Sequence, residues 1–215
     1  MRITRIEPQQ RRPGRFNIHA DGEFLIGVSA ETLVSFGLRT GDEITEETRR
    51  RLADAEDSAA ARAAAMRLLA VRPRTEKEIR DRLRAKEFGD ERIAALLEDL
   101  RRSGLVNDEQ FCRMFVHDVL ALRPTGRIPL RRKLLLLGVR KETVDQTLDE
   151  AFAGVDQEGA ALELARAFLR KDPARRDPAK LRPRLASYLG RKGYGWDIIH
   201  QVLQKVIGDN EQNGL

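Results

Sequence analysis

The sequence contains few of the residues from which catalytic and metal sites are built. Its 215 residues include one cysteine and three histidines, so an internal disulfide cannot form and soft metal ligands are scarce. His19, His117 and His200 fall in separate predicted elements, and the chain has neither a glycine-rich phosphate loop nor a Gly-x-Ser-x-Gly turn. We therefore expect a non-enzymatic protein that has no metal and no cofactor.

Two residues that could be taken for reactive groups have simpler explanations. His19 belongs to a short predicted strand and lacks a second histidine, cysteine or carboxylate cluster at metal-binding spacing. Cys112 follows Phe111 on a predicted helix, where a small, half-buried side chain is more common than an activated thiolate. We expect structural roles for both, and a surface position for His117.

Long apolar runs are also missing. Nowhere do 18 apolar residues follow one another, and residues 1–8 contain no apolar signal core. A single cysteine is typical of proteins in a reducing compartment. These absences predict a soluble protein that stays in the cytoplasm and does not enter a membrane.

Aromatic residues make up only 5% of the chain, which limits the surfaces on which nucleic-acid bases could stack. Tyr188, Tyr194 and Trp196 lie close together near the C-terminus. Because Tyr194 and Trp196 flank a turn at Gly195, core packing is the simpler explanation for both. Base stacking is therefore not favoured by the sequence.

The sequence does contain one helical pattern that occurs three times with the same internal spacing. The middle copy places apolar residues at Leu130, Leu134, Val139, Val144 and Leu148. The first copy lies 51 residues earlier, at Ile79, Leu83, Phe88, Ile93 and Leu97, and the third lies 55 residues later, at Leu185, Leu189, Tyr194, Ile199 and Leu203. A period of about 50 residues is typical of stacked helical repeats. The alternative is that unrelated amphipathic helices align by chance.

The first 45 residues show strand patterns in place of the repeated helical pattern. Ile3 and Ile6 lie in a strand-like segment. Polar and apolar residues alternate over residues 15–20, Asp21-Gly22 is a dipeptide typical of a type I′ hairpin turn, and residues 23–28 form the returning strand. Ser29 is placed to cap a short helix that ends at Phe36. This region predicts a β-hairpin and a helix that need the rest of the chain to complete a core.

Several helix boundaries follow from local signals. Thr45 opens a helix to Val71 that an interruption near Asp57–Ser58 could divide, and residues 75–78 form a capping box. Asp90 is the expected cap of the next helix, and Pro129 fits the first turn of another. The expected buried stripe of the helix after Asn107 is Phe111, Phe115, Val119 and Leu122, and that of the helix after Asp156 is Leu164, Ala165, Phe168 and Leu169.

Together these patterns predict a mainly α fold: three tandem three-helix repeats that form a curved, elongated solenoid, preceded by a small N-terminal β-hairpin and a short helix. We place the N-terminal module at residues 1–45, a linker helix with the first repeat at 46–106, the second repeat at 107–153, the third at 154–209 and a frayed tail at 210–215.

Positive charge is concentrated in the second and third repeats. The net charge is +6, which favours an anionic partner. Residues 123–141 contain seven cations and no acid, so we expect the local potential to be uncancelled; the candidate contacts are Arg123, Arg127, Arg131, Arg132, Lys133, Arg140 and Lys141. A second set is Arg182, Arg184 and Arg191. The alternative is that these side chains only solvate helix faces.

The threefold pattern, the loop from Gly104 to Phe111 and the segment from Gly126 to Val139 resemble the RecX family of bacterial regulators. The resemblance covers about Ala59 to Ile207, and residues 21–24 and 38–43 look like the extension of longer members. It implies a protein that binds the RecA recombinase and its DNA filament, inhibits ATPase, strand exchange and coprotease activity, and promotes filament disassembly. Weak DNA binding and a monomeric state are also expected.

The chain departs from the family pattern at a few positions. Where members commonly have Lys-Gly-Phe, it has Lys86-Glu87-Phe88, so a left-handed helix end there would cost about 1 kcal/mol and the helix could end differently. Lys133 replaces a common acid and Cys112 a common alanine. Two other functions stay open: a sequence-nonspecific DNA-binding helical protein without a recombinase partner, and a scaffold that self-associates.

Overall fold

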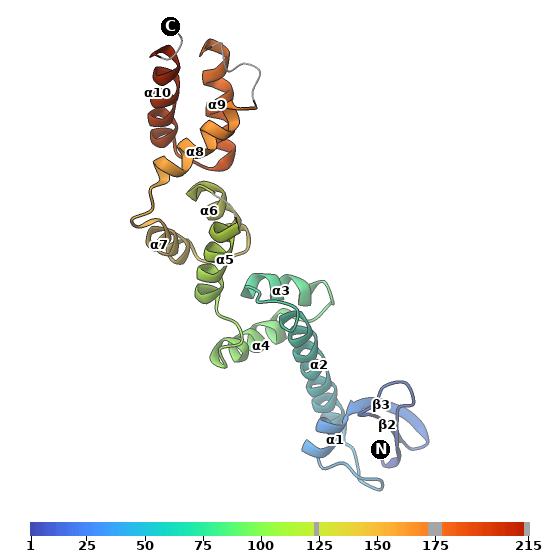
Figure 1. The fold of residues 1–215 in the computed structure, drawn as a ribbon. Coiled ribbons are helices and arrows are strands. Elements are labelled where there is room, and N and C mark those ends of the chain that lie inside the picture. Colours follow the sequence, from blue (N-terminus) through green and yellow to red (C-terminus); the bar gives the residue numbers. More distant parts are fainter. Residues whose placement is uncertain (123–124, 172–177, 213–215) are drawn as a thin grey trace. The chain divides into compact units, whose positions relative to one another are not determined.

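The computed structural model describes residues 1–122, 125–171 and 178–212. In these ranges a three-stranded sheet precedes ten helices (Figure 1), which confirms the predicted mainly α class. The strands are β1 (Ile3–Pro8), β2 (Arg15–Ala20) and β3 (Glu23–Ser29). The helices are α1 (Ala30–Ser35), α2 (Glu46–Leu69), α3 (Glu76–Arg84), α4 (Asp90–Arg102), α5 (Asp108–Leu122), α6 (Arg127–Leu136), α7 (Lys141–Phe152), α8 (Gln157–Leu169), α9 (Pro178–Lys192) and α10 (Trp196–Gln212).

The chain divides into two compact units. The N-terminal unit comprises Met1–Pro73 and Ile79–Leu105, and the C-terminal unit comprises Arg74–Glu78 and Val106–Leu215. The first turn of α3 therefore belongs to the C-terminal unit. The finer division into five segments drawn from the sequence stays a prediction.

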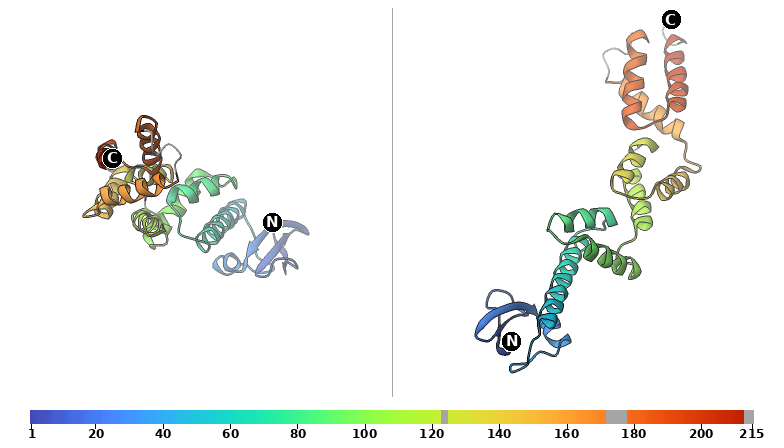
Figure 2. Two further views of the ribbon diagram at one scale, coloured as in Figure 1. Left: turned by 45° about the horizontal axis from the view of Figure 1, so that its top comes forward. Right: turned by 180° about the vertical axis from the view of Figure 1, so that it is seen from behind.

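The N-terminal sheet contains the predicted hairpin, and the predicted strand-like segment at Ile3 and Ile6 pairs with it as a third strand. β2 and β3 pair antiparallel around Asp21 and Gly22, which have φ values of 51° and 90°, as a type I′ turn requires. β1 pairs antiparallel with β2, so the strand order is β1-β2-β3. Figure 2 shows the sheet from two further sides, beside α1 and the start of α2.

Helices α1 and α2 close the core of this sheet. Ile18, Val28 and Leu52 are fully buried between them. The Ser29 hydroxyl accepts a hydrogen bond from the Thr32 amide, which confirms the predicted cap of α1. A buried carboxylate joins the two layers, because Glu56 on α2 accepts a hydrogen bond of 2.7 Å from the Ser29 amide and forms an ion pair with Arg15 on β2 at 2.9 Å.

The predicted interruption of α2 at Asp57–Ser58 is wrong, because the helix runs unbroken from Glu46 to Leu69. The Ser58 hydroxyl donates to the Asp54 carbonyl at 2.8 Å, and Asp57 forms an ion pair with Arg92 of α4 at 3.3 Å. Ser58 is satisfied by a carbonyl of its own helix and Asp57 by an ion pair, so neither side chain interrupts the helix.

The capping box that opens α3 is confirmed. The Glu78 amide donates to the Thr75 hydroxyl at 3.2 Å, and the Thr75 amide donates to the Glu78 carboxylate at 3.3 Å. At the start of α4 the prediction is wrong by one residue: Gly89 is the N-cap, and Asp90 instead accepts a hydrogen bond of 2.7 Å from Arg84.

The threefold framework is confirmed by burial. Of its fifteen apolar positions, all but the half-buried Phe88 are less than 5% exposed. In each copy the second helix ends in the same Schellman motif, with hydrogen bonds from Phe88 to Leu83, from Val139 to Leu134 and from Tyr194 to Leu189. The left-handed residue of this motif is Gly138 in the second copy, Gly193 in the third and Glu87 in the first, with φ values of 87°, 91° and 65°. The helix at Glu87 therefore ends like the others, although its residue is not glycine.

Two of the predicted helix stripes need correction. In α5 the buried side chains are Cys112 and Val116, whereas Phe111 and Phe115 are half-buried at the margin and Leu122 is 85% exposed. In α8 the fully buried residues are Ala161 and Ala165, with the larger Leu164, Phe168 and Leu169 partly buried around them. Small side chains occupy the centre in both helices, because the leucines of the following helices already fill the core. On α10, Ile199, Val202, Leu203 and Val206 are at most 5% exposed, and that helix extends to Gln212, into the predicted tail.

Within the C-terminal unit, one joint occurs twice. The Thr75 hydroxyl donates to the Leu137 carbonyl at 2.7 Å, and a Cβ on Gly138 would meet the Lys77 Cβ at 2.5 Å. In the second instance the Gly126 amide donates to the Lys192 carbonyl at 2.9 Å, and a Cβ on Gly193 would meet the Pro129 Cδ at 1.9 Å. Each joint thus places the start of one second helix on the turn that ends the next.

Candidate interaction surface on α6 and α9

Helix α6 turns its leucines both inward and outward. Leu130 and Leu134 are buried in the core with α5 and α7, while Gly126 provides the N-cap and Pro129 lies in the first turn, as predicted. Ile128 and Leu136 point away from this core and are 56% and 64% exposed. Single exposed apolar side chains are common on protein surfaces, but apolar side chains grouped on one helix face can mark a contact surface.

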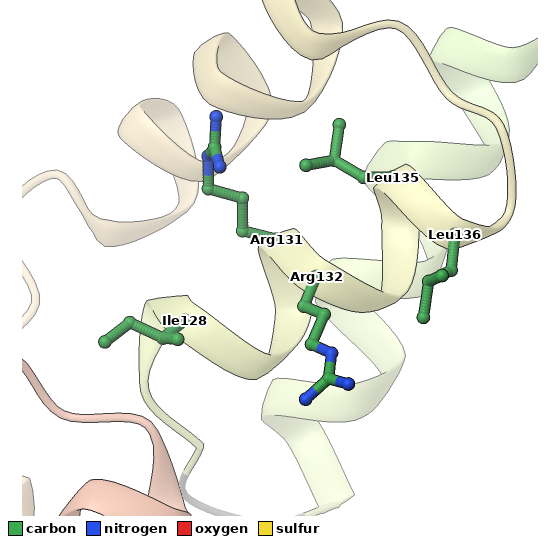
Figure 3. A pocket seen from close by; sticks show the side chains of 5 residues that line it. All are labelled: Ile128, Arg131, Arg132, Leu135 and Leu136. Carbon is green, nitrogen blue, oxygen red and sulfur yellow. The ribbon is translucent and has the colours of Figure 1, made fainter.

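A shallow hollow of about 470 Å³ lies along this outer face. Its lining residues are Ile128, Arg131, Arg132, Leu135 and Leu136. Figure 3 shows that the guanidinium groups of Arg131 and Arg132 point in opposite directions from the helix. The face therefore combines apolar side chains with one arginine in its middle, since Ile128, Arg132 and Leu136 are spaced four residues apart.

Arg131 is held by an acid from the neighbouring helix. Its guanidinium donates two hydrogen bonds to the Asp145 carboxylate of α7, at 2.7 and 3.3 Å. The hydrogen bond from Arg131 lowers the pKa of the Asp145 carboxyl below its ordinary value, and the same contact raises the pKa of Arg131. One turn earlier Arg127 forms an ion pair with Asp149. The expectation that the positive potential of this segment is uncancelled is therefore wrong for Arg127 and Arg131.

The other predicted cations of this segment are placed differently. Arg132, Lys133 and Arg140 are exposed and form no ion pair within the described residues. Lys141 is exposed and adds to the positive field that acts on Asp145. Arg123 lies outside the residues that the structure describes. The side chains available to an external anion are thus Arg132, Lys133, Arg140 and Lys141, of which Arg132 alone lines the hollow.

The equivalent face of α9 is also hollowed, with different chemistry. A recess of about 410 Å³ is lined by Phe168, Pro183, Arg184, Ser187 and Arg191. Pro183, Ser187 and Arg191 lie 55 residues after Ile128, Arg132 and Leu136, so they occupy the same positions of the repeat. Of the second predicted set, the structure brings Arg184 and Arg191 together in this recess, whereas the exposed Arg182 is not part of its lining.

The remaining candidates have structural explanations, with one exception. The His19 imidazole on β2 is hydrogen-bonded to the Glu7 carboxylate at 3.1 Å, and the described residues contain no cluster of side chains able to hold a metal. Cys112 is fully buried, and that burial raises the pKa of its thiol, which disfavours the reactive thiolate. Tyr194 is 4% exposed, as core packing predicts, but Trp196 is 66% exposed, so the same prediction is wrong for Trp196.

Comparison with known proteins connects this architecture to one family. Residues 1–45 match the family description of the regulatory protein RecX N-terminal domain, residues 61–100 the first RecX three-helix domain and residues 156–203 the third. The regulatory protein RecX of Clostridium beijerinckii is 31% identical over 210 residues, which is 96% of each chain. The chain belongs to the RecX family. A RecX relative from Bacillus velezensis is also 31% identical, over 97% of this chain and 79% of the relative.

Solved RecX structures have the same fold. A crystal structure of regulatory protein RecX superposes with a TM-score of 0.73 at 25% identity and covers 94% of this chain and 98% of its own. RecX from Lactobacillus salivarius gives a TM-score of 0.60 at 22% identity, over 71% of this chain and 97% of its own. None of the described helices has the length and apolarity that a membrane span requires. The RecX relatives are named regulatory proteins, and none of these names describes a reaction.

Sequence reasoning about this RecX chain missed the neutralised arginines and the exposed apolar pair. A signal for the former was present, because Arg127 and Arg131 are four residues apart on one helix and Asp145 and Asp149 are four apart on the next. The exposure of Ile128 and Leu136 had no comparable signal. A leucine-rich helix does not reveal which of its leucines remain outside the core.

Proposed function

We propose that this chain is a non-enzymatic regulator of the RecA recombinase, which binds RecA and its DNA filament and inhibits ATPase, strand exchange and coprotease activity while promoting filament disassembly. Membership of a family named for regulation supports the regulatory part of this proposal. RecA as the partner follows from the resemblance of the sequence, and a protein with this partner would act in the cytoplasm, where the recombinase works on DNA.

The outer face of α6 is the observation that carries the proposal. Two exposed apolar side chains, Ile128 and Leu136, flank a guanidinium that has no acidic partner among the described residues. Protein interfaces commonly place an arginine anchor among apolar side chains, because an apolar surround excludes water from the ion pair formed on binding. We infer that the partner surface presents a carboxylate to Arg132 and apolar groups to Ile128 and Leu136.

The neutralised arginines fit a role in positioning this face. Arg131 and Arg127 bind Asp145 and Asp149 of α7, so they fix α6 against its neighbour. An exposed ion pair contributes little to stability, but a bidentate arginine restricts the rotation of the helix surface it bridges. Arg132 and Lys133, and Arg140 beyond the turn, remain available for the partner.

The experiment is the ATPase rate of RecA on single-stranded DNA during titration with this chain, at fixed salt and with DNA in excess. Inhibition well below one molecule per RecA monomer supports action on the filament. The test variants are Ile128→Ser with Leu136→Ser, and Arg132→Glu. We expect each to raise the half-inhibitory concentration about tenfold or more, as for anchor residues of an interface.

Leu122→Ser is the matched control, since Leu122 is 85% exposed on α5 of the same repeat and is not among the residues that line the hollow. It should inhibit like the unaltered chain. If the α6 variants fold normally by circular dichroism and inhibit as well as this control does, the assignment of the contact to α6 is wrong.

The competing function is a nonspecific DNA-binding protein without a recombinase partner, and the cationic recess of α9 favours it. In that case RecA inhibition appears only once the DNA itself is saturated. Duplex binding would then show a slope of log affinity against log salt near about −5 for about six phosphates.

A further inference from the structure

The third repeat contains a surface whose chemistry differs from that of α6 although its place in the repeat is the same. We propose that the recess between α8 and α9 binds the phosphodiester backbone of a single nucleic-acid strand, through Arg184 and Arg191 with the Ser187 hydroxyl between them. This proposal rests on the proposed function and adds to it: the second repeat would contact the protein partner, and the third repeat would contact the nucleic-acid strand.

The positive field over α9 is not opposed by the helix itself. α9 carries five cations and no aspartate or glutamate. Leu181, Leu185 and Leu189 bury one side of the helix, so Arg184, Ser187 and Arg191 share the exposed side at spacings of three and four residues. Within the described residues Arg191 forms no ion pair, so its charge is available to a ligand.

The donor set suits phosphate oxygens. Arginine and serine side chains are among the usual contacts to the phosphate backbone, and they fix the position of a strand without reading its sequence. Seven residues separate Arg184 from Arg191, which corresponds to about 10 Å along the helix axis. That separation equals about three steps of a stacked strand at about 3.4 Å for each phosphate, so the two guanidinium groups would contact different phosphates.

The wall of the recess is mostly polar and is backed by stacked rings. Phe168 of α8 stacks on Tyr188 of α9 with ring centroids 4.8 Å apart, and the Lys192 ammonium lies 5.7 Å from the centre of the Tyr188 ring. Unlike α6, the recess exposes no aliphatic side chain except the ring of Pro183. Of the five lining residues only Phe168 and Pro183 are apolar, and the cores of protein interfaces are usually depleted of charge, so the mostly polar lining favours a nucleic-acid strand over an acidic protein segment.

The test uses the full chain and a fluorescein-labelled single-stranded oligonucleotide of about 30 nucleotides, with no RecA present, and follows anisotropy at several salt concentrations. For Arg184→Gln with Arg191→Gln we expect at least about tenfold weaker binding at low salt. The loss of two phosphate contacts should also reduce the steepness of the salt slope by about 1.4.

The matched control is Arg166→Gln with Arg170→Gln, which removes the same net charge from two exposed side chains of the same repeat: Arg166 on α8, which pairs with Glu163, and Arg170, the C-cap of α8. It should bind within about twofold of the unaltered chain. A second variant, Arg184→Lys with Arg191→Lys, keeps the charge and loses the planar fork. It should keep the salt slope and lose only part of the affinity.

Three outcomes would overturn the proposal. Equal losses in the glutamine variant and in its control would show that only net charge matters. Unchanged DNA binding in the glutamine variant would show that the strand lies elsewhere. Unchanged DNA binding together with weaker RecA inhibition would assign the recess to a protein partner. Because the anisotropy assay contains no recombinase, a failure of the RecA proposal leaves its result unaffected.

Discussion

Glu87 holds a backbone conformation that suits glycine, and its replacement by glycine should stabilise the protein. Its φ is 65°, and it occupies the left-handed position of the Schellman motif that ends α3. Residues with a Cβ pay roughly 1–2 kcal/mol in this region. Glycine avoids that cost but loses about 0.4–1 kcal/mol through the greater freedom of the unfolded chain. The expected net gain for Glu87→Gly is about 0.5–1 kcal/mol.

The structure shows why this gain is available here and not at the equivalent positions. Glu87 is exposed, and within the described residues its side chain has no hydrogen bond or ion pair to lose. In contrast, Gly138 and Gly193 pack against Lys77 and Pro129. A Cβ at either position would clash with its neighbour, in addition to the cost of the left-handed backbone. The first copy receives no such contact among the described residues, which explains how a larger residue fits there.

The assay is thermal unfolding followed by circular dichroism, supported by hydrogen exchange of the Phe88 amide that closes the motif. For a chain of this length, a gain of about 1 kcal/mol raises the melting temperature by about 2–4 °C. Glu87→Ala is the control, since it removes the carboxylate and keeps the Cβ. Equal melting temperatures for the glycine and alanine variants would refute the backbone argument.

Three further changes test the packing and the ion pairs. Gly193→Ala should destabilise the C-terminal unit by about 3 kcal/mol in urea unfolding, because a Cβ would clash with the Pro129 ring and the φ of residue 193 is 91°. Gly154→Ala is the control without a clash, since Gly154 has a φ of 73° and a Cβ there would meet nothing within 4 Å. Glu56→Gln should cost about 2 kcal/mol at pH 7 by depriving Arg15 of its partner. Burial opposes ionisation of Glu56, but hydrogen bonds from Thr32 and Ser29 and the charge of Arg15 outweigh it and lower its pKa, so the difference between the two proteins should shrink as pH falls below about 4.5. Arg131→Ala should raise the pKa of Asp145 toward its ordinary value in an NMR titration of the carboxyl carbon, and an unchanged pKa would contradict the observed pairing.

The repeating core was predictable from the sequence because it depends on spacing alone. Residues such as Leu134, Val144 and Leu148 recur at fixed distances, and any arrangement that buries one copy buries the others. Caps at Ser29, Thr45 and Thr75 were also predictable, since each depends on a side chain three residues from the amide it binds. These signals are local or periodic, so they can be found without coordinates.

Which side of α5 faces the core could not be predicted in the same way. Phe111 and Phe115 are the larger apolar residues, and their spacing alone predicts that they face the core. The structure buries Cys112 and Val116 instead, because Leu130, Leu134 and Leu148 leave room only for small side chains. The two phenyl rings stack on one another at the margin, 6.1 Å apart. Which of two adjacent stripes is buried depends on the volumes supplied by other helices.

The candidate site was predicted only as a region of charge. The sequence located the cations of residues 123–141, but it could not show that α7 neutralises Arg127 and Arg131. Ion pairs between helices depend on the rotation of each helix, which spacing within one helix does not determine. The contact surface proposed for α6 is therefore centred on Arg132 and its apolar neighbours.

The second helix of each repeat has a buried side that is alike in the three copies and an exposed side that differs between them. The inward positions are alike, since Leu83, Leu134 and Leu189 are all completely buried. The outward positions diverge: the first copy has Lys77, Asp81 and Ala85, the second Ile128, Arg132 and Leu136, and the third Pro183, Ser187 and Arg191. Burial constrains the inward side chains because a change there leaves a cavity or a clash, whereas outward side chains can change at little cost in stability. A repeated framework can therefore present an apolar face with a central cation in one copy and a cationic face with a central hydroxyl in another, which is the difference expected if the two faces bind different parts of a protein–DNA filament.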